Sequence, residues 1–309
     1  MTAAALVPSP GEQGVLSNDP AGAAARTLAS WDDFIAVAEQ ADLRTVARAK
    51  RRLGREVVLP LGAWPQCRSL AGILADAAAG STTAPVDLER EERDVIAAQS
   101  GASDAQVVDA LRSARDAVAT FLVSAASTDL FDLPTASPLG PLPVLTLLHA
   151  ATYQLAVCAL DLEPCGAVVP AGMLERGVIA LVDTTGALAG RQGITGSITA
   201  VMPGSVWGFA AHGGAWRTAE RQRTPGPPDG PAVEAAARVI LDITSGRNHN
   251  VPGLWRDGSL ITHDLAGLSR LSPILDQVPG IPGGMALRAA SKALSSVTGI
   301  LGRRPRWAT

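Results

Sequence analysis

Apolar residues recur at helical spacing along the first two thirds of the chain. The first such stretch begins at Ser30, and its apolar positions lie a few residues apart: Trp31, Phe34, Ile35, Ala38, Ala41 and Leu43. Ser30 followed by Asp33 is a helix start signal, so we expect the first helix to run from here toward Leu53, with Gly54 ending it. Residues 1–28 are rich in Ala, Pro, Gly and Ser without periodicity, which predicts a disordered leader outside the fold.

Further helices are predicted between loops that are rich in proline and glycine. They are expected over the segments 67–80, 104–127, 144–162 and 171–190. The charged segment "DLEREERD" is typical of a solvated loop or helix face, and residues 129–143 contain enough prolines to predict a loop. Residues 30–192 are therefore predicted to form a bundle of helices, with the nearly continuous apolar helix "VLTLLHAATYQLAVCALDL" near its centre.

The pattern changes near residue 194 to short runs rich in β-branched and aromatic residues. Strands are expected in "GSITAVM" and "SVWGFAAHGGAWRTAE", with "HGG" supplying a hairpin turn. After a Pro/Gly linker we expect a helix over 232–246, a second hairpin turning at Asp257 and Gly258, and a helix over 264–278. The predicted fold class is α+β, with the bundle followed by a smaller α+β module over residues 194–282.

Composition narrows the classes of function. The 309 residues are 47% hydrophobic and 18% charged, which suffices for a core in each of two domains. A net charge of −3 and an aromatic content of 4% argue against nucleic acid as a partner. The cysteines, Cys67, Cys158 and Cys165, form no CxxC pair, so a reducing compartment fits better than a disulfide framework or zinc knuckle. Without a signal-like N-terminus or a long uninterrupted apolar span, the chain is predicted to be cytoplasmic.

Polar residues form one stripe on the apolar helix that contains "TYQLAVCALDL". Gln154 and Asp161 lie four before and three after Cys158, so the stripe could hold a metal, attack a substrate or line a small polar pocket. His149 lies nine positions before Cys158 and therefore on the opposite side of the helix. Because no Lys, Arg or His lies within one turn of Cys158, packing as a buried thiol is favoured over nucleophilic chemistry.

The C-terminal segment 284–309 is predicted to form an amphipathic helix with a basic end. Its apolar positions are followed by Arg303, Arg304, Arg306 and Trp307, a pattern found in segments that lie on membrane surfaces. The alternative is a helix docked on its own protein or on a dimer partner. Peripheral membrane contact is therefore kept as a second possibility beside a purely cytoplasmic location.

Several segments together resemble the mycothiol-dependent maleylpyruvate isomerase family. Trp64 and Leu70 precede a short helix, a later helix carries "YQLAVCALDL", and "AAARVILDITSGRNHN" leads into a turn at Gly246 and Arg247 ahead of "DGSLITHDL". The resemblance implies a DinB-like four-helix bundle at the N-terminal end and a sterol-carrier-like C-terminal module. Arg247 in this turn could contact an anion or cap the preceding helix.

The resemblance also implies where a metal would be held. The family binds its metal with two histidines and one glutamate, and the matching positions in this sequence are Ile73, Gln154 and Cys158. Isoleucine offers no lone pair, and a neutral amide is a much weaker ligand than a carboxylate for a divalent ion. No metal is therefore expected, and the ligand pocket is predicted from Trp64, Ile73, Gln154, Cys158 and Asp161, with Cys158 as the candidate catalytic residue.

Three functional hypotheses follow. The leading one is a member of the maleylpyruvate isomerase/DinB-like superfamily with a degenerate metal site, which binds a small thiol-containing or lipophilic ligand and needs no cofactor. The second is an active isomerase or thiol S-transferase that uses mycothiol and a divalent metal such as zinc. The third is an interaction protein that contacts a membrane surface or a partner through its C-terminal helix.

Overall fold

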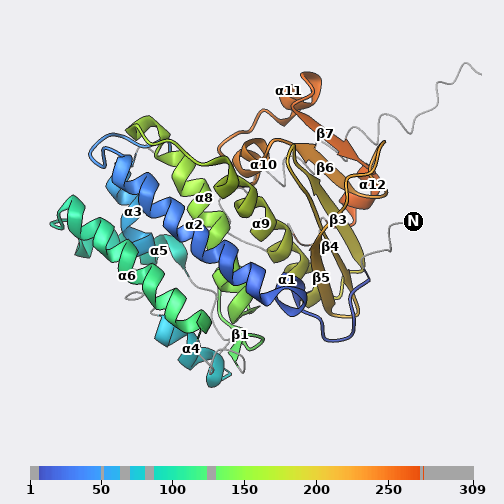
Figure 1. Ribbon diagram of the computed structural model, residues 1–309, viewed down its shortest axis with the longest axis horizontal. Helices are drawn as coiled ribbons and strands as arrows, with labels where there is room; N and C mark the ends of the chain where they lie inside the picture. Colours follow the sequence, from blue (N-terminus) through green and yellow to red (C-terminus); the bar gives the residue numbers. More distant parts are fainter. Residues whose placement is uncertain are drawn as a thin grey trace, which may run out of the picture.

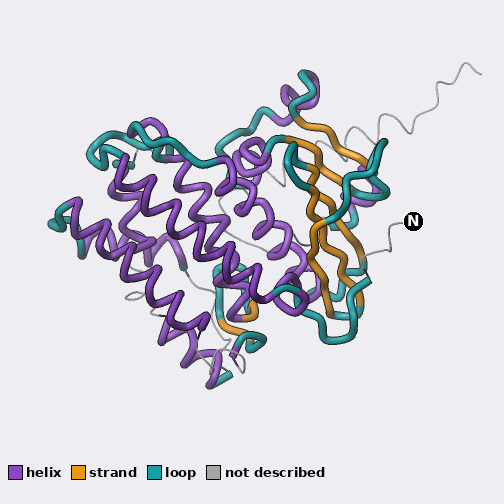
Figure 2. The backbone as a smooth tube through the Cα atoms, in the orientation of Figure 1, coloured by secondary structure: helices purple, strands orange, loops and turns teal. Residues whose placement is uncertain are grey.

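The computed structural model describes residues 7–49, 52–62, 70–80, 87–123, 130–271 and 274. A layer of helices lies beside a single twisted sheet, and the long helix α9 lies between them (Figures 1 and 2). Trp64, Cys67 and the whole C-terminal segment 284–309, with Arg303, Arg304, Arg306 and Trp307, lie outside the described residues. The α+β class predicted from the sequence is confirmed.

The helical layer contains the predicted helices in their order, and α3 and α5 in addition. Its helices are α2 (Pro20–Gln40), α3 (Gly54–Gly62), α4 (Leu70–Ala78), α5 (Leu88–Ala98), α6 (Asp104–Val123), α8 (Val144–Asp161) and α9 (Ala171–Arg191). The charged segment "DLEREERD" belongs to α5, whose N-cap Asp87 accepts a hydrogen bond from the Arg90 backbone N–H. In the loop before α8, β1 (Pro134–Thr135) and β2 (Leu142–Pro143) form a short antiparallel pair.

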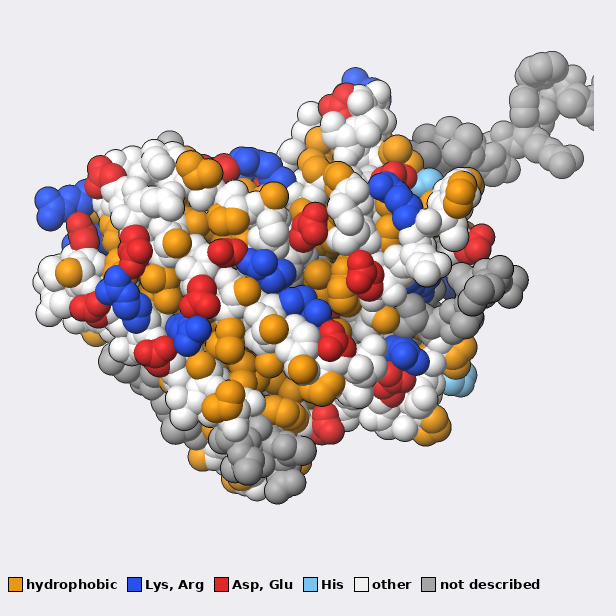
Figure 3. Space-filling view, viewed as in Figure 1, with side chains coloured by type: hydrophobic (Ala, Val, Ile, Leu, Met, Phe, Trp, Pro, Cys, Tyr) orange, Lys and Arg blue, Asp and Glu red, His pale blue; other side chains and the backbone are white. Residues whose placement is uncertain are grey.

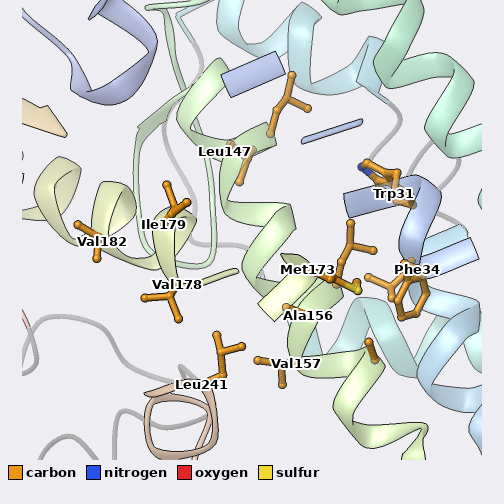
Figure 4. Close-up of a cluster of buried hydrophobic side chains, with 14 of the residues drawn as sticks. Trp31, Phe34, Leu147, Ala156, Val157, Met173, Val178, Ile179, Val182 and Leu241 are labelled. Carbon is orange, nitrogen blue, oxygen red and sulfur yellow. The ribbon is translucent and has the colours of Figure 1, made fainter. Parts of the chain in front are cut away.

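α8 is the central helix of this layer because nearly all of its surface is apolar. Leu155, Ala156, Ala159 and Leu160 are completely buried, and α8 packs against α2 and α9 through Phe34, Met173 and their neighbours (Figure 4). Within the described part of the chain, α8 is the helix long and apolar enough to span a membrane by length and composition alone. In this structure 72% of its residues are buried inside the protein.

The sheet has five strands in the order β5-β4-β3-β6-β7. They are β3 (Gly196–Val201), β4 (Val206–His212), β5 (Ala215–Glu220), β6 (Ala232–Ala235) and β7 (Leu260–His263). Neighbouring strands are antiparallel except β3 and β6, which run parallel. The predicted "HGG" turn is confirmed: Gly213 and Gly214 have φ of 60° and 85°, values that a two-residue hairpin requires at both turn positions.

Two predictions for the C-terminal module are wrong in part. Residues 232–235 form β6 before α10 (Ala237–Thr244) begins, because β3 offers them a free edge to pair with. Asp257 and Gly258 do not turn a hairpin: they follow the helix α11 (Val251–Arg256), and β7 pairs with β6. α12 (Leu265–Ser269) then contacts β3.

The predicted leader is wrong for the residues that the structure describes. α1 (Gly14–Asn18) and the first turns of α2 fall within residues 1–28, and Val15 and Ala23 are completely buried. The backbone N–H of Trp216 on β5 donates to the Glu12 carbonyl at 3.0 Å, so this segment covers the edge strand of the sheet. Its order comes from these distant contacts rather than from its own composition.

The first helices also begin and end at other residues than predicted. α2 starts at Pro20, where Asp19 caps the Gly22 N–H, and ends at Gln40 because Asp42 holds a turn with Thr45. Gly54 begins α3 instead of ending a helix, and Pro60 lies inside it. Glu56 supports this start, since its carboxylate accepts the Leu53 backbone N–H at 2.8 Å.

α9 makes the bundle and the sheet share one hydrophobic core. Its Met173 lies beside Ala156 of α8 and Phe34 of α2, and its Val178 lies toward Leu241 of α10 (Figure 4). α9 also packs on β4 and β5. Gly186 permits the close approach to the sheet, because a Cβ there would lie 2.7 Å from the Trp216 ring. The predicted boundary near residue 193 is therefore a change of secondary structure inside a continuous core.

The exposed side of the bundle carries charges of both signs. Basic and acidic side chains are interspersed over the face that bears α2 and α6 (Figure 3). Arg115 pairs with Asp32 at 2.8 Å, and Arg112 pairs with Glu39, each joining α6 to α2. Mixed charges of this kind give this face no single-sign patch that would attract nucleic acid.

Candidate functional site

The polar stripe of α8 lies at the end of the helix that meets the C-terminal module. Gln154 and Cys158 are half-buried, whereas the side chain of Asp161 in the last turn is buried. The C-terminal end of α8 is followed by a 3-10 helix, Glu163–Cys165, which turns the chain back toward α9. Asp161 is thus placed where bundle, loop 41–49 and C-terminal module meet.

Asp161 binds two arginines from distant parts of the chain. Arg247 Nε and Nη2 donate to its two carboxylate oxygens at 3.2 and 2.5 Å. Arg48 Nε lies 3.4 Å from Oδ1, and the Arg48 backbone N–H donates to the Asp161 carbonyl at 2.9 Å. A planar guanidinium and a carboxylate match at two points, so the pair with Arg247 fixes both position and orientation.

Asp242 on α10 completes the group. Arg48 donates to its carboxylate through Nη1 and Nη2 at 3.2 and 2.7 Å, and the backbone N–H groups of Arg247 and Asn248 donate to its carbonyl. We call Arg48, Asp161, Asp242 and Arg247 the Asp161 cluster. Its two positive and two negative charges balance, so it has no spare charge with which to bind an ion. Both roles expected for Arg247 find a partner inside the protein: its guanidinium contacts the Asp161 carboxylate, and its Nη1 donates to the Ser245 carbonyl at the end of α10 at 3.1 Å.

Cys158 lies one turn before Asp161 and next to the same cluster. Burial raises the pKa of its thiol, and the nearby Asp161 carboxylate raises it further, whereas Arg247 acts to lower it. The net shift is upward, so the thiol is protonated near neutral pH. A protonated thiol is a poor nucleophile and a poor metal ligand.

Tyr153 links the stripe to the C-terminal module. Its hydroxyl donates to the Thr244 hydroxyl oxygen at 3.2 Å. Burial raises the pKa of Tyr153 to about 12, against lowering contributions from the Thr244 hydrogen bond and from Arg247. The Tyr153 hydroxyl is therefore protonated near neutral pH and acts as a neutral hydrogen-bonding group.

Ile73 lies at the other end of α8. Its carbonyl accepts from the Thr135 hydroxyl at 3.4 Å, and Thr135 pairs with Leu142, just before α8 begins. Helical rise places Gln154 about 15 Å and Cys158 about 21 Å along α8 from its first residue, Val144. α4 accordingly lies beside β1, far from the loop that follows α8 (Figure 1). The contacts of Ile73 do not bring it to the polar stripe.

The side chains at the predicted metal-ligand positions do not fit a divalent metal ion, and neither does Asp161. Ile73 has no ligand atom, Gln154 offers a neutral amide, Cys158 keeps its proton, and both oxygens of Asp161 are engaged by arginines. Among the described ranges, no group of three or more His, Cys, Asp or Glu side chains is arranged to hold an ion.

A second polar group is buried on the opposite side of α8. His149 Nδ1 lies 3.0 Å from Asp183 Oδ2 on α9, and Asp183 Oδ1 accepts from the Val15 N–H and from Trp216 Nε1. Burial acts to raise the pKa of Asp183, but the hydrogen bond and charge of His149 and the hydrogen bond from the Val15 N–H act against it, and the net shift of the pKa is downward. This group ties α1, α8, α9 and β5 together, and it confirms that His149 faces away from Cys158.

Comparison with known proteins gives one informative result. No protein-family model matches the sequence, and no curated protein matches it. Among solved structures, a mutant of the mycothiol-dependent maleylpyruvate isomerase aligns with a TM-score of 0.50 and 13% identity, over 80% of this chain and 92% of that chain. The protein has the fold of the mycothiol-dependent maleylpyruvate isomerase.

A second structure of that isomerase aligns over the same shares of both chains with a TM-score of 0.49 and 13% identity. The first of these alignments confirms the maleylpyruvate isomerase fold predicted from the sequence, and at 13% identity the likeness concerns the fold alone. The sequence did not identify Arg48, Asp242 or Asp183 as partners of site residues. Each acts across a long stretch of chain, so no local motif marks it.

Proposed function

We propose that this protein belongs to the maleylpyruvate isomerase/DinB-like superfamily and binds a small ligand without metal-assisted thiol chemistry. The observation that carries the proposal is the state of Cys158: a half-buried, protonated thiol beside a carboxylate whose oxygens are both engaged. A metal-bound thiolate needs a cation that lowers the thiol pKa, and the surroundings of Cys158 act in the opposite direction.

The polar stripe supports ligand binding rather than packing alone. Gln154 and Cys158 keep part of their surface exposed on a helix that is mostly buried. Arg52 lies close enough to act on the Cys158 pKa, and its guanidinium pairs with Glu92 on α5 at 2.9 Å. A ligand at this position would meet an amide, a neutral thiol and a charge-balanced rim. The first ligand to test is mycothiol, on which the structural neighbour depends by name.

The test combines metal analysis with calorimetry on full-length, tag-free protein. We expect far less than one equivalent of zinc or nickel in the wild type, and mycothiol binding that Cys158→Ala and Gln154→Ala weaken by about tenfold, or 1.4 kcal/mol. Cys165→Ala is the matched control, because Cys165 is a free cysteine in the 3-10 helix and should leave binding unchanged. Stoichiometric metal that disappears in Cys158→Ala would overturn the proposal in favour of an active metal-dependent enzyme. Absence of mycothiol binding to the wild type would refute a thiol-bearing ligand.

A further inference from the structure

A cavity of about 380 Å³ opens at one end of the sheet, in the C-terminal module. It is lined by the turn between β3 and β4 and by the residues that follow β5: Pro203, Gly204, Ser205, Val206, Glu220, Arg221, Gln222 and Arg223. The volume falls in the range of small-molecule sites. None of these residues belongs to the polar stripe of α8 or to the Asp161 cluster.

The two arginines of this cavity differ in their partners. Arg223 donates to the Pro203 carbonyl at 3.3 Å and pairs with Glu234 at 3.4 Å. Arg221 is half-buried, and its buried Nε has no hydrogen-bond partner within the described part of the chain. Other half-buried arginines of the described chain, such as Arg48 and Arg247, form ion pairs with carboxylates. A partly buried cation without a counter-charge is unfavourable unless a ligand supplies the anion.

Among the residues that the structure describes, no nearby carboxylate is positioned to neutralise Arg221. Glu234 is shared between Arg223 and His263, and Glu175 accepts from the Ser205 hydroxyl at 3.5 Å. Glu220 precedes Arg221 in the chain and is exposed to solvent. Burial lowers the pKa of Arg221, with no opposing contribution from a charged neighbour.

The sheet holds the Arg221 guanidinium over its surface. The Arg221 backbone N–H donates to the Val206 carbonyl at 2.7 Å and continues the ladder beyond β5. The side chain then crosses Gly208 of β4, where a Cβ would lie 2.8 Å from Arg221 Nε. Gly208 therefore leaves the space that the guanidinium occupies, and the side chain is positioned before any ligand arrives.

We propose that this cavity is a second ligand site, in which Arg221 binds the oxyanion of a small carboxylate or phosphate compound. A guanidinium offers two parallel N–H groups to two oxygens of such an anion. The Gln222 amide also lines the cavity and supplies a further donor, whereas the Ser205 hydroxyl already donates to Glu175. The site is independent of the ligand proposed at Cys158.

The test follows the Arg221 Nε–H resonance by NMR in full-length protein with labelled arginine. Acetate and inorganic phosphate are titrated separately at constant ionic strength, with chloride as the control anion. We expect a saturable shift with a Kd on the order of 1 mM for at least one of them. Acetate binding alone would assign a carboxylate, and phosphate binding alone a phosphate group.

Three variants are measured by calorimetry with the anion that binds. Arg221→Gln should abolish binding, and Arg221→Lys should weaken it at least about fivefold because the fork of donors is lost. Arg217→Gln is the matched control: Arg217 lies on β5, pairs with Glu12 and does not line the cavity, so binding should be unchanged. The melting temperature of Arg221→Gln should equal or exceed that of the wild type, since an unpaired buried charge is removed. The proposal fails if neither anion shifts the resonance saturably, or if Arg221→Gln and Arg221→Lys bind as the wild type does.

Discussion

Asp161 and Arg247 form a two-point contact that joins the last turn of α8 to the turn after α10, with Nε and Nη2 at 3.2 and 2.5 Å from the two carboxylate oxygens. The Asp161 side chain is only 1% exposed, so the contact has little competition from water. The same carboxylate restrains Arg48 and raises the pKa of Cys158. One residue thus joins three segments and adds to the effect of burial on the pKa of the neighbouring thiol.

Asp161→Ala should lower the free energy of unfolding by about 3 kcal/mol, because it leaves Arg247 partly buried without its carboxylate. Urea unfolding at neutral pH measures this. Arg112→Ala is the control: it breaks an exposed pair with Glu39 and should leave the free energy of unfolding nearly unchanged. If both variants lower the free energy of unfolding by similar amounts, the Asp161 cluster does not stabilise the contact between α8 and the C-terminal module.

Cys158 should react slowly with iodoacetamide. In a Cys67→Ser, Cys165→Ser background, the folded protein at about pH 8 should be alkylated at least about tenfold more slowly than the urea-unfolded chain, since one pKa unit changes the thiolate fraction tenfold. The folded rate should continue to rise above pH 9, the ordinary thiol pKa. A rate that levels off near pH 7 would indicate a thiolate and contradict the proposed state.

Asp183→Asn should flatten the response of stability to acid. The folded-state pKa of Asp183 is lowered, so its contribution is present above the ordinary value of 3.8 and is lost as the pH falls through the folded pKa. At neutral pH the free energy of unfolding of the variant should be lower by about 2 kcal/mol, because His149, Trp216 and the Val15 N–H lose a charged partner.

Urea unfolding measured at several pH values below 5 tests this expectation. The difference in the free energy of unfolding between wild type and Asp183→Asn should become smaller as the pH falls. Asp229→Asn, in an exposed loop, serves as control and should follow the wild type. A constant gap down to the lowest pH would show that the Asp183 charge does not stabilise the fold.

Gly14→Ala should be more harmful than Gly11→Ala. Both glycines have positive φ, 70° and 76°, so each substitution introduces backbone strain of about 1 kcal/mol. A Cβ at Gly14 would also lie 2.3 Å from Asp183 Oδ1 and 2.5 Å from Trp216 Nε1, whereas Gly11 has open space around it. We expect an additional loss of about 2 kcal/mol for Gly14→Ala, measured by thermal unfolding. Equal losses would mean that α1 does not pack here.

The sequence by itself determined the elements whose signals are local. The long helices α6, α8 and α9 follow from apolar spacing and from the prolines and glycines around them, and the β4–β5 hairpin follows from Gly213 and Gly214. The stripe of Gln154, Cys158 and Asp161 also follows from helical geometry alone, as does the position of His149 on the opposite face. These features depend on residues that are close in the chain.

Only the tertiary structure decided which of these residues act together. Glu12 and Val15 are ordered by Trp216 and Asp183, about two hundred residues away, although their own segment has no helical periodicity. Arg48, Asp161 and Arg247 meet because α8 packs against the C-terminal module, and that packing leaves Ile73 at the other end of the helix. Ion pairs and buried hydrogen bonds act through space, so their partners leave no spacing in the sequence by which they could be predicted.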